Sequence, residues 1–339
     1  MKTLPKILLF LLSATSIYFH YINNISSEIQ SNIYEDLFSG EYREESTIRF
    51  GILNTDFPNL SLSSLPMKAV IGRYYFLGAQ YDKALDLANQ SMNDNPYIMY
   101  SESLKTDIYF RLGVKDSMMY YAERAFTGIP NNNKHFIDLA RAYVNFDKYK
   151  LLDSVFGVVE NTRDQEIWKF YFSGLLTKED SITKYGKEKA REALKIFPSS
   201  SGGDPNLRLS AAYVLYGTER ISKAIEANKK ASDLYDQGKI RESALKYEEA
   251  SELNPLEYTY FENAGISNFQ FGYYDKAIPF LNHVIDSINP NTGKSEFVLA
   301  QIYNKLGDMD NACKYIYASS KFNYKDSFRK IGEYCIDNN

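Results

Sequence analysis

The chain has 339 residues, 44 % of them hydrophobic, which is enough apolar material for one globule or for an extended array of smaller units. A formal net charge of −4 at pH 7 excludes the strongly basic surface that nucleic-acid-binding proteins usually carry. The 29 tyrosines suit helix packing, because a ring fills gaps between helices while its hydroxyl reaches the surface.

Residues 1–24 contain an apolar run that follows two lysines, Lys2 and Lys6. The run is close to the roughly 20 residues that a helix needs to span a bilayer, although serines, a threonine and His20 dilute it. No clean small-x-small cleavage site follows. We therefore predict an uncleaved signal anchor or transmembrane helix, with a cleaved signal peptide or a buried core helix as alternatives. The two lysines would stay in the cytoplasm, which places the remaining chain on the extracytoplasmic side.

Residues 25–64 show a weaker helical pattern in two parts. Ile29, Ile33 and Leu37 lie on one helical face, and a second apolar face follows after Gly40. This segment predicts a degenerate helix pair that caps the N-terminal end of the array that follows it.

Residues 65–200 are organised by a step of 34 residues, which separates Tyr75, Tyr109 and Tyr143. A fixed step of this length is typical of a stacked supersecondary unit. Within the first unit, Gly78 interrupts the helical pattern and Pro96 ends it. Each unit is thus two short helices that bury one face each and must stack to complete a core. The same step relates small or fairly small residues at Gly72, Thr106, Ala140 and Gly174, and prolines at Pro96, Pro130 and Pro198.

These residues resemble the tetratricopeptide repeat (TPR), a helix-turn-helix unit of the same length, and in particular the bacterial membrane-anchored or exported type. The TPR pattern has a small residue at position 8, Tyr at 11, an aromatic at 17, Ala at 20 and Pro at 32. The first unit matches at Gly72, Tyr75, Tyr81, Ala84 and Pro96, and later units depart at Met118, Thr177 and Gly186. The resemblance implies an all-α fold, a right-handed α-solenoid, with four units in 65–200 and three in 224–324.

Between these two sets lies a junction, residues 201–223. Ser199–Pro205 is rich in serine and glycine, and an extra helix is predicted over Asn206–Tyr216. We interpret the junction as an imperfect repeat with an insertion, and a hinge between two solenoid halves is the alternative. Residues 325–339 are predicted to form a C-terminal capping helix.

Cys313 and Cys335 are the only cysteines of the chain. If their helices are antiparallel neighbours, the Cβ atoms reach the separation that a disulfide needs, and an extracytoplasmic location would permit oxidation. The pair is therefore a disulfide candidate, with two reduced buried cysteines as the alternative. The ending that includes both cysteines also resembles the close of many bacterial exported repeat arrays.

Motifs for chemistry are absent from the sequence. His20, His135 and His283 share no short spacing with each other or with a cysteine, so no metal site is predicted. Gly202-Gly203 lacks the lysine and the helix start of a phosphate loop, and no Gly-x-Ser-x-Gly nucleophile motif occurs. We expect a protein that is not an enzyme and that needs no cofactor.

The TPR resemblance also implies a binding groove, because in this family positions 2, 5, 9, 12 and 13 of each first helix point into it. Arginine interleaved with aromatic residues is the composition that anchors protein partners. The basic clamp for acidic C-terminal peptides is not evident in the pattern. The predicted partner-binding residues are Arg73, Phe76, Tyr100, Asp107, Phe110, Arg111, Arg141, Asn145, Trp168 and Tyr171.

The resulting function hypothesis is a non-catalytic scaffold, tethered to the bacterial cell membrane, that binds a protein or peptide partner on the extracytoplasmic side. Cleavage of the signal would instead make it a secreted or periplasmic protein. A different hypothesis is an accessory role in cell-envelope polysaccharide assembly, because several O-antigen polymerases and ligases carry a similar repeat array after their last membrane helix.

Overall fold

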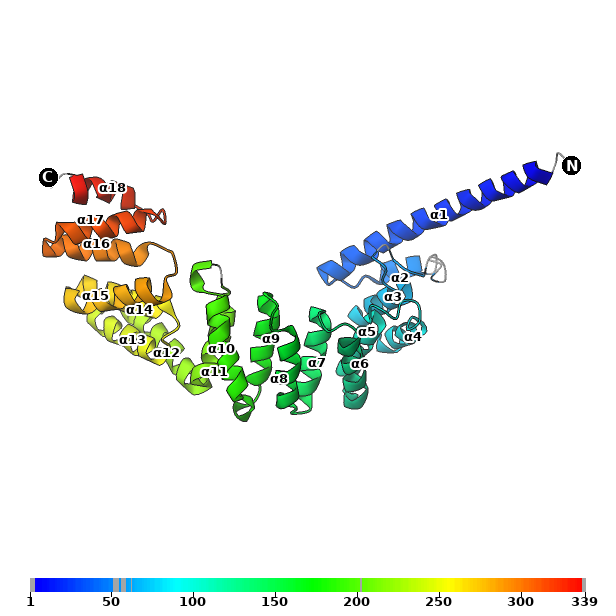
Figure 1. The fold of residues 1–339 in the computed structure, drawn as a ribbon, viewed down its shortest axis with the longest axis horizontal. Helices are drawn as coiled ribbons and strands as arrows, with labels where there is room; N and C mark the ends of the chain where they lie inside the picture. Colours follow the sequence, from blue (N-terminus) through cyan, green and yellow to red (C-terminus); the bar gives the residue numbers. More distant parts are fainter. Residues whose placement is uncertain (1–3, 51–54, 56–58, 62, 202, 337–339) are drawn as a thin grey trace. The chain divides into compact units, whose positions relative to one another are not determined.

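The computed structural model describes residues 4–50, 55, 59–61, 63–201 and 203–336. Within these ranges the regular secondary structure is helical and includes no strand (Figure 1). An isolated β-bridge joins Leu60 and Pro66. The prediction of an all-α fold is confirmed for this part of the chain. The predicted segments 1–24, 25–64, 201–223 and 325–339 each include some residues outside the described ranges.

The chain folds into two compact units, residues 1–161 (unit 1) and residues 162–339 (unit 2). The division lies between Asn161 and Thr162, so the predicted junction around Ser199–Pro205 lies inside unit 2. In unit 1 the described helices are α1 (Leu4–Ser39), α2 (Glu44–Phe50), α3 (Met67–Leu77), α4 (Tyr81–Gln90), α5 (Tyr100–Leu112), α6 (Lys115–Gly128), α7 (Asn133–Asn145) and α8 (Tyr149–Val159).

Helices α3 to α8 form three consecutive helix pairs, each with a first and a second helix. A small residue at position 8 allows the helices to approach closely. A Cβ atom at Gly72 would lie 3.2 Å from the carbonyl oxygen of Ala84 on α4 and 3.0 Å from Leu104 on α5. The same glycine therefore sets the distance from α3 to its pair partner and to the next first helix.

Helix α1 continues without a break across residue 24, where the sequence predicted a boundary. Its second half packs through Ile29 and Ile33 against Phe50 of α2 and Tyr74 of α3. The buried carboxylate of Asp36 accepts hydrogen bonds from Tyr74 Oη at 2.9 Å and from Ser46 Oγ at 2.8 Å. This half of α1 and the short α2 together cover the N-terminal face of the first helix pair.

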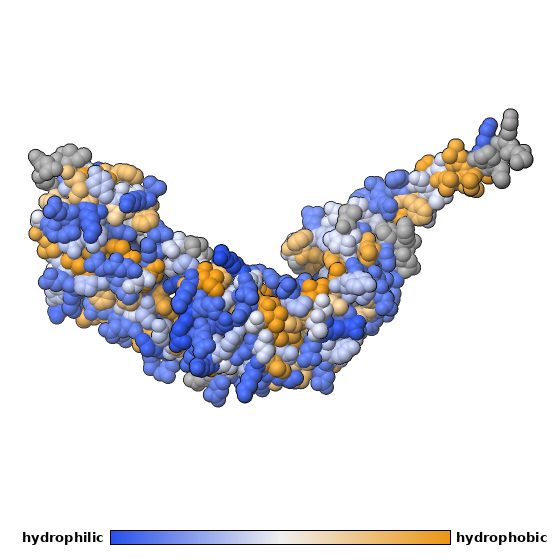
Figure 2. Space-filling view, viewed as in Figure 1, coloured by the Kyte–Doolittle hydropathy of each residue, from blue (hydrophilic) through white to orange (hydrophobic). Residues whose placement is uncertain are grey.

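The first half of α1 carries exposed apolar side chains between Ile7 and Tyr21, and Figure 2 shows this hydrophobic surface toward the N-terminal end of the helix. None of the helices in the described part of the chain combines the length and the apolar character that crossing a bilayer requires. This finding contradicts the predicted signal anchor and the location on the extracytoplasmic side of a membrane that was predicted from it. The physical reason is that polar residues such as Ser13, Ser16 and His20 interrupt the run, and the rest of α1 is polar.

Unit 2 begins with the pair formed by α9 and α10 and the single helix α11, followed by three further pairs. Its described elements are α9 (Gln165–Leu175), η1 (Glu179–Ser181), α10 (Lys184–Ile196), η2 (Ser199–Ser201), α11 (Pro205–Tyr216), α12 (Thr218–Asp236), α13 (Ile240–Leu253), α14 (Tyr258–Phe271), α15 (Tyr274–His283), η3 (Val284–Ile288), α16 (Lys294–Leu306), α17 (Met309–Ser320), α18 (Ser327–Ile331) and η4 (Gly332–Ile336).

The later pairs of unit 2 repeat the close contact seen at Gly72. A Cβ atom at Gly265 of α14 would lie 2.7 Å from Cγ of Leu281 and 3.3 Å from the carbonyl oxygen of Ala277, both on α15.

Arg220 links α12 to the end of α13, because its side chain donates to the carbonyl oxygens of Glu252 and Leu253 at 2.8 and 2.9 Å.

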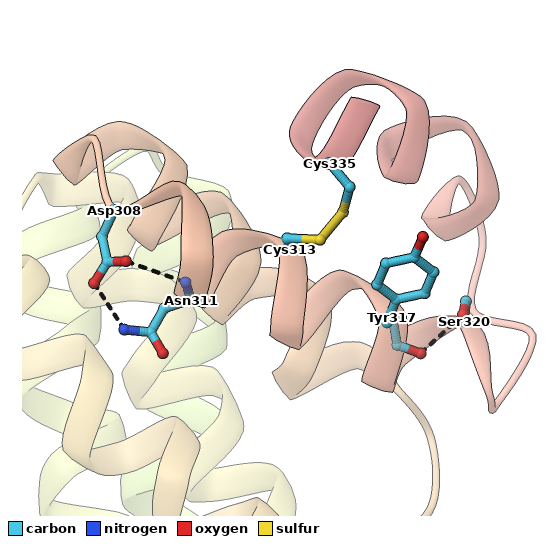
Figure 3. The surroundings of a disulfide bond; sticks show 6 residues. All are labelled: Asp308, Asn311, Cys313, Tyr317, Ser320 and Cys335. Carbon is cyan, nitrogen blue, oxygen red and sulfur yellow. Dashed lines mark hydrogen bonds between the residues drawn. A yellow bond between two sulfur atoms is a disulfide. The ribbon is translucent and has the colours of Figure 1, made fainter. Parts of the chain in front are cut away.

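The C-terminal elements close the last helix pair. Tyr334 of η4 is buried against Ala300, Ala312 and Ile316. A disulfide joins Cys313 of α17 to Cys335 of η4, with a Cα–Cα distance of 5.2 Å (Figure 3). The covalent link therefore holds the capping segment over the apolar end of the array.

We predict that Gly265→Ala leaves unit 2 less stable than Gly332→Ala does. Both changes gain the helix preference of alanine, about 1 kcal/mol. Only the first change meets Leu281 and Ala277, and such overpacking costs about 1 to 3 kcal/mol, whereas nothing lies within 4 Å of a Cβ atom at Gly332. Urea unfolding of the two variants measures the difference, and equal stabilisation of both would contradict the packing role of Gly265.

A second prediction concerns the disulfide, which spans 22 residues of sequence. Closing a loop of this size stabilises a folded chain by about 3 kcal/mol. We expect the double variant Cys313→Ser, Cys335→Ser to lose stability by this order of magnitude, and a reducing agent to lower the melting temperature of the natural chain but not of the variant. Thermal unfolding with and without reductant tests this expectation; identical melting curves would argue against the bond.

Candidate partner-binding surface

The first helices of unit 1, α3, α5 and α7, are neighbours, and together they form what we call the first-helix face. Arg73, Asp107 and Arg141 are each 34 residues apart and occupy equivalent positions on these helices. Asp107 Oδ2 accepts from Arg73 Nη1 at 2.7 Å, and its Oδ1 accepts from Arg141 Nη1 at 3.2 Å. Residues one repeat apart thus form a row of alternating charge across three helix pairs. We call the row of Arg73, Asp107 and Arg141 the ladder.

Two residues that the sequence reasoning missed, Lys134 and Asp138, extend this ladder. Lys134 Nζ donates to Asp107 Oδ1 at 3.0 Å and also bonds the carboxylate of Asp138. Ser103 Oγ donates to Asp138 Oδ2 at 2.9 Å. The available signal was the spacing of four residues between Lys134 and Asp138, which puts opposite charges on one helix face.

Burial and neighbouring charge act in opposite directions on the two carboxylates. Burial favours the neutral form of Asp107, but the charges and hydrogen bonds of Lys134 and Arg73 outweigh it, so the pKa of Asp107 lies below its ordinary value. Burial and the negative charge of Asp107 raise the pKa of Asp138, despite the opposing effect of Lys134. Asp107 is therefore the ionised centre of the cluster.

Aromatic rings flank the arginines of the ladder. The guanidinium of Arg73 lies 5.3 Å from the ring centre of Tyr100, and that of Arg141 lies 4.9 Å from the ring centre of Phe110. Both distances fall within the range of a cation–π contact. Burial would lower the pKa of Arg73, but Tyr100 and Asp107 raise it overall, so this guanidinium stays charged.

The exposed side of this cluster is cationic. The side chains of Lys134 and Arg141 are 41 % and 28 % exposed, whereas those of Asp107 and Asp138 are 10 % and 0 % exposed. Arg111 lies one turn after Asp107 on the same helix face, is exposed, and forms no ion pair with any residue that the structure describes. The buried carboxylates thus fix the positions of the more exposed cations. A ligand that binds this surface would contact the positively charged side chains first.

The predicted site residues are not all on this surface. Asn145 lies one turn after Arg141, is exposed, and donates from Nδ2 to the carbonyl oxygen of Arg141 at 2.8 Å. Phe110 is 38 % exposed and therefore accessible. Phe76, in contrast, is half-buried against Tyr81 and the alanine-rich core between α3 and α4.

Trp168 and Tyr171 of α9 belong to unit 2 and are fully buried, so the prediction that they anchor a partner is wrong. Trp168 packs against Phe172 and Phe197, and its Nε1 donates to the carbonyl oxygen of Thr162 at 3.1 Å. The physical reason is that these rings form the core of the α9–α10 pair. The sequence of this pair has fewer matches to the repeat pattern than the earlier pairs have.

The described residues contain no group of three or more His, Cys, Asp or Glu side chains that would suit a metal ion. The first-helix face presents ion pairs and ring contacts, in which charged and aromatic side chains lie together.

We predict that Asp107→Asn destabilises unit 1 far more than Asp138→Asn. The first change leaves three cations without their shared carboxylate, and breaking a buried ion pair from one side costs about 3 to 5 kcal/mol. The second change keeps an amide oxygen that can accept from Ser103 and Lys134. Lys134 and Arg141 also keep their ion pairs with Asp107, so a loss of about 1 kcal/mol is expected. Urea unfolding of both variants gives the comparison, and a similar loss in both would contradict the central role of Asp107.

The pH dependence should follow from the lowered pKa of Asp107. A carboxylate with a lowered pKa stabilises the fold above its unfolded pKa, which is about 3.9, and this contribution is lost as the pH falls through the folded value. Unfolding of the natural chain between neutral and acidic pH should therefore show a loss that Asp107→Asn lacks. A variant as acid-sensitive as the natural chain would count against this assignment.

Comparison with known proteins adds one relative and several solved structures. No family model matches the chain. A segment of 78 residues is 33 % identical to the Hsp70-Hsp90 organising protein of Plasmodium falciparum and spans 23 % of this chain but only 14 % of that protein.

The solved structures that match the chain include a repeat protein and a repeat domain. A tetratricopeptide repeat protein from Parabacteroides merdae is 13 % identical, with a TM-score of 0.36, over 78 % of this chain and 96 % of that one. The TPR2AB domain of yeast Sti1 in complex with pHSP90 is 15 % identical, with a TM-score of 0.31, over 78 % and 95 % of the two chains. The 34-residue step and the close contacts at Gly72 and Gly265 within helix pairs agree with the resemblance to tetratricopeptide repeats.

Proposed function

We propose that the chain is a non-catalytic scaffold that binds a protein or peptide partner on the first-helix face of unit 1. The observation that carries the proposal is the arrangement of charge on this face: Lys134 and Arg141 point outward while Asp107 and Asp138, which hold them, are buried. A network of this kind fixes long side chains before a ligand arrives, and fixed side chains bind with a smaller loss of entropy.

The partner class follows from the exposed groups. Lys134, Arg141 and Arg111 present positive charge, and Phe110 adds an accessible aromatic ring among them. Arginines beside aromatic rings are the residue types that dominate binding energy at protein interfaces. The arrangement supports a partner segment that carries carboxylates next to apolar side chains. The relative from Plasmodium falciparum is named for organising two chaperones, which agrees with a scaffold role in this chain.

Arg73 is unsuitable for testing this proposal, because its charge holds the ladder together through Asp107. Arg111 is suitable, because it is exposed and its loss leaves the ladder intact. We expect Arg111→Glu to weaken binding of a fluorescent peptide of alternating Glu and Leu by at least tenfold, which corresponds to about 1.4 kcal/mol. Added salt should weaken binding to the natural chain, because the attraction is between exposed charges.

The matched control is Lys115→Glu, which makes the same charge change at an exposed position on the second helix α6. Fluorescence anisotropy should show unchanged affinity for this variant, and no binding of a Gln and Leu peptide to the natural chain. Equal affinity of the natural chain and Arg111→Glu for the acidic peptide would overturn the assignment of this face.

A further inference from the structure

A small cavity opens on unit 2, where the second helices α13 and α15 meet the end of the first helix α14. Its volume is about 70 Å³. The cavity has an apolar side and a charged side, which are formed by different elements. The lining residues are Arg241, Ala244, Leu245, Glu248, Asn268, Phe271, Tyr273 and Lys276.

The apolar side of the cavity is exposed to solvent. Leu245 is 52 % exposed, Phe271 is 41 % exposed and Tyr273 is 42 % exposed. The rings of Phe271 and Tyr273 meet edge to face with their centres 4.7 Å apart, so they form a fixed wall. Three large apolar side chains at the mouth of one cavity are a composition that marks binding surfaces.

The charged side of the cavity has an excess of cations. Glu248 Oε1 accepts from Asn268 Nδ2 at 2.8 Å, and its Oε2 lies 3.9 Å from Lys276 Nζ, so groups of the protein already surround this carboxylate. The guanidinium of Arg241 lies 6.0 Å from the ring centre of Phe271 and has no carboxylate partner among the described residues. The residues that line the cavity therefore include two cations and one carboxylate, an excess of one positive charge.

The next repeat lacks this combination at the equivalent place. Gly272 and Gly307 both end a first helix with a positive φ, of 90° and 78°, which aligns the two repeats at a step of 35 residues. At that step Tyr273 corresponds to Asp308 and Lys276 corresponds to Asn311. Asp308 Oδ2 accepts from Asn311 Nδ2 at 2.7 Å, so these polar groups satisfy each other (Figure 3). The next repeat keeps an exposed apolar residue at this place, Leu306. It has Asp308 in place of the aromatic Tyr273 and Asn311 in place of the cation Lys276.

The size of the cavity restricts what enters it. A volume of about 70 Å³ beside an exposed apolar wall leaves room for one small apolar side chain such as leucine. The excess of positive charge among the lining residues favours carboxylates beside that side chain. We infer that this cavity is a second docking site, for a partner segment with an aliphatic anchor flanked by acidic residues. It lies on the second helices of unit 2 and is independent of the first-helix face.

Methyl NMR of the full chain with labelled leucine tests this inference, because Leu245 lies at the mouth of the cavity. The probe is a synthetic peptide with one central Leu between Glu and Asp residues. We expect it to shift the Leu245 methyl signals, and we expect the same peptide with Ala for Leu, or with Lys for the acids, to leave them in place. Arg241→Glu should weaken the peptide's affinity at least tenfold, while the matched variant Leu306→Ala should bind as the natural chain does.

Three results would overturn the inference. The first is an unchanged Leu245 signal at saturating acidic peptide, and the second is equal binding of the basic peptide. The third is a shift of Leu245 on raising the concentration of the chain alone, which would identify a second copy as the occupant. Arg111→Glu separates this site from the one on unit 1, since we expect that variant to leave the Leu245 shift intact.

Discussion

The structure depends on one packing constraint, which is that each helix pair has apolar faces that it cannot bury alone. A pair must therefore lie against the next pair, and within a pair the distance between the two helices is set by the residue at their closest contact. Gly72 and Gly265 occupy that contact in the two units, where a side chain would collide with a neighbouring helix. The small residue at this position makes the stack possible, and the stack supplies the core that no single pair has.

Stacking at a constant step also decides which polar residues meet. When first helices lie side by side, residues one repeat apart become neighbours across the helix interface, as Arg73, Asp107 and Arg141 do. A buried carboxylate is costly unless opposite charges and hydrogen bonds surround it, and Asp107 has three cations. The same stacking that builds the core thus holds the cations of the first-helix face in fixed positions.

The 34-residue step predicted the helix pairs, because periodicity indicates which residues form the core. The resemblance to the repeat family named Arg73, Asp107, Phe110 and Arg141, and the structure places these four residues together on the first-helix face. The same resemblance failed at Trp168 and Tyr171, which fill the core of a pair with few matches to the pattern. It missed Lys134, because that residue reaches Asp107 of the preceding pair from the start of α7.

The N-terminal prediction failed for a different reason. The prediction used the hydropathy of residues 1–24 alone. In the structure α1 is a single longer helix, and its later turns pack through Ile29 and Ile33 on the first pair. The boundary assumed at residue 24 has no physical cause in the structure, since no helix breaker stands there. Tertiary contacts of this kind lie beyond what composition can indicate.

An array that grows by stacking must also stop, and its two units use their terminal elements for this purpose in different ways. At the N-terminal end, the later half of α1 covers the first pair, and Asp36 fixes it through hydrogen bonds to Tyr74 and Ser46. At the C-terminal end, Tyr334 and the disulfide hold the segment after α17 on an apolar face of α16 and α17. A long helix brings its own apolar face, whereas a short segment buries little surface and gains more from a covalent bond.

The outer surfaces of the helices do not serve the stack. Residues on these surfaces, such as Arg241 and Phe271, can therefore differ from one repeat to the next. Such differences allow a repeat array to carry distinct binding sites on different repeats.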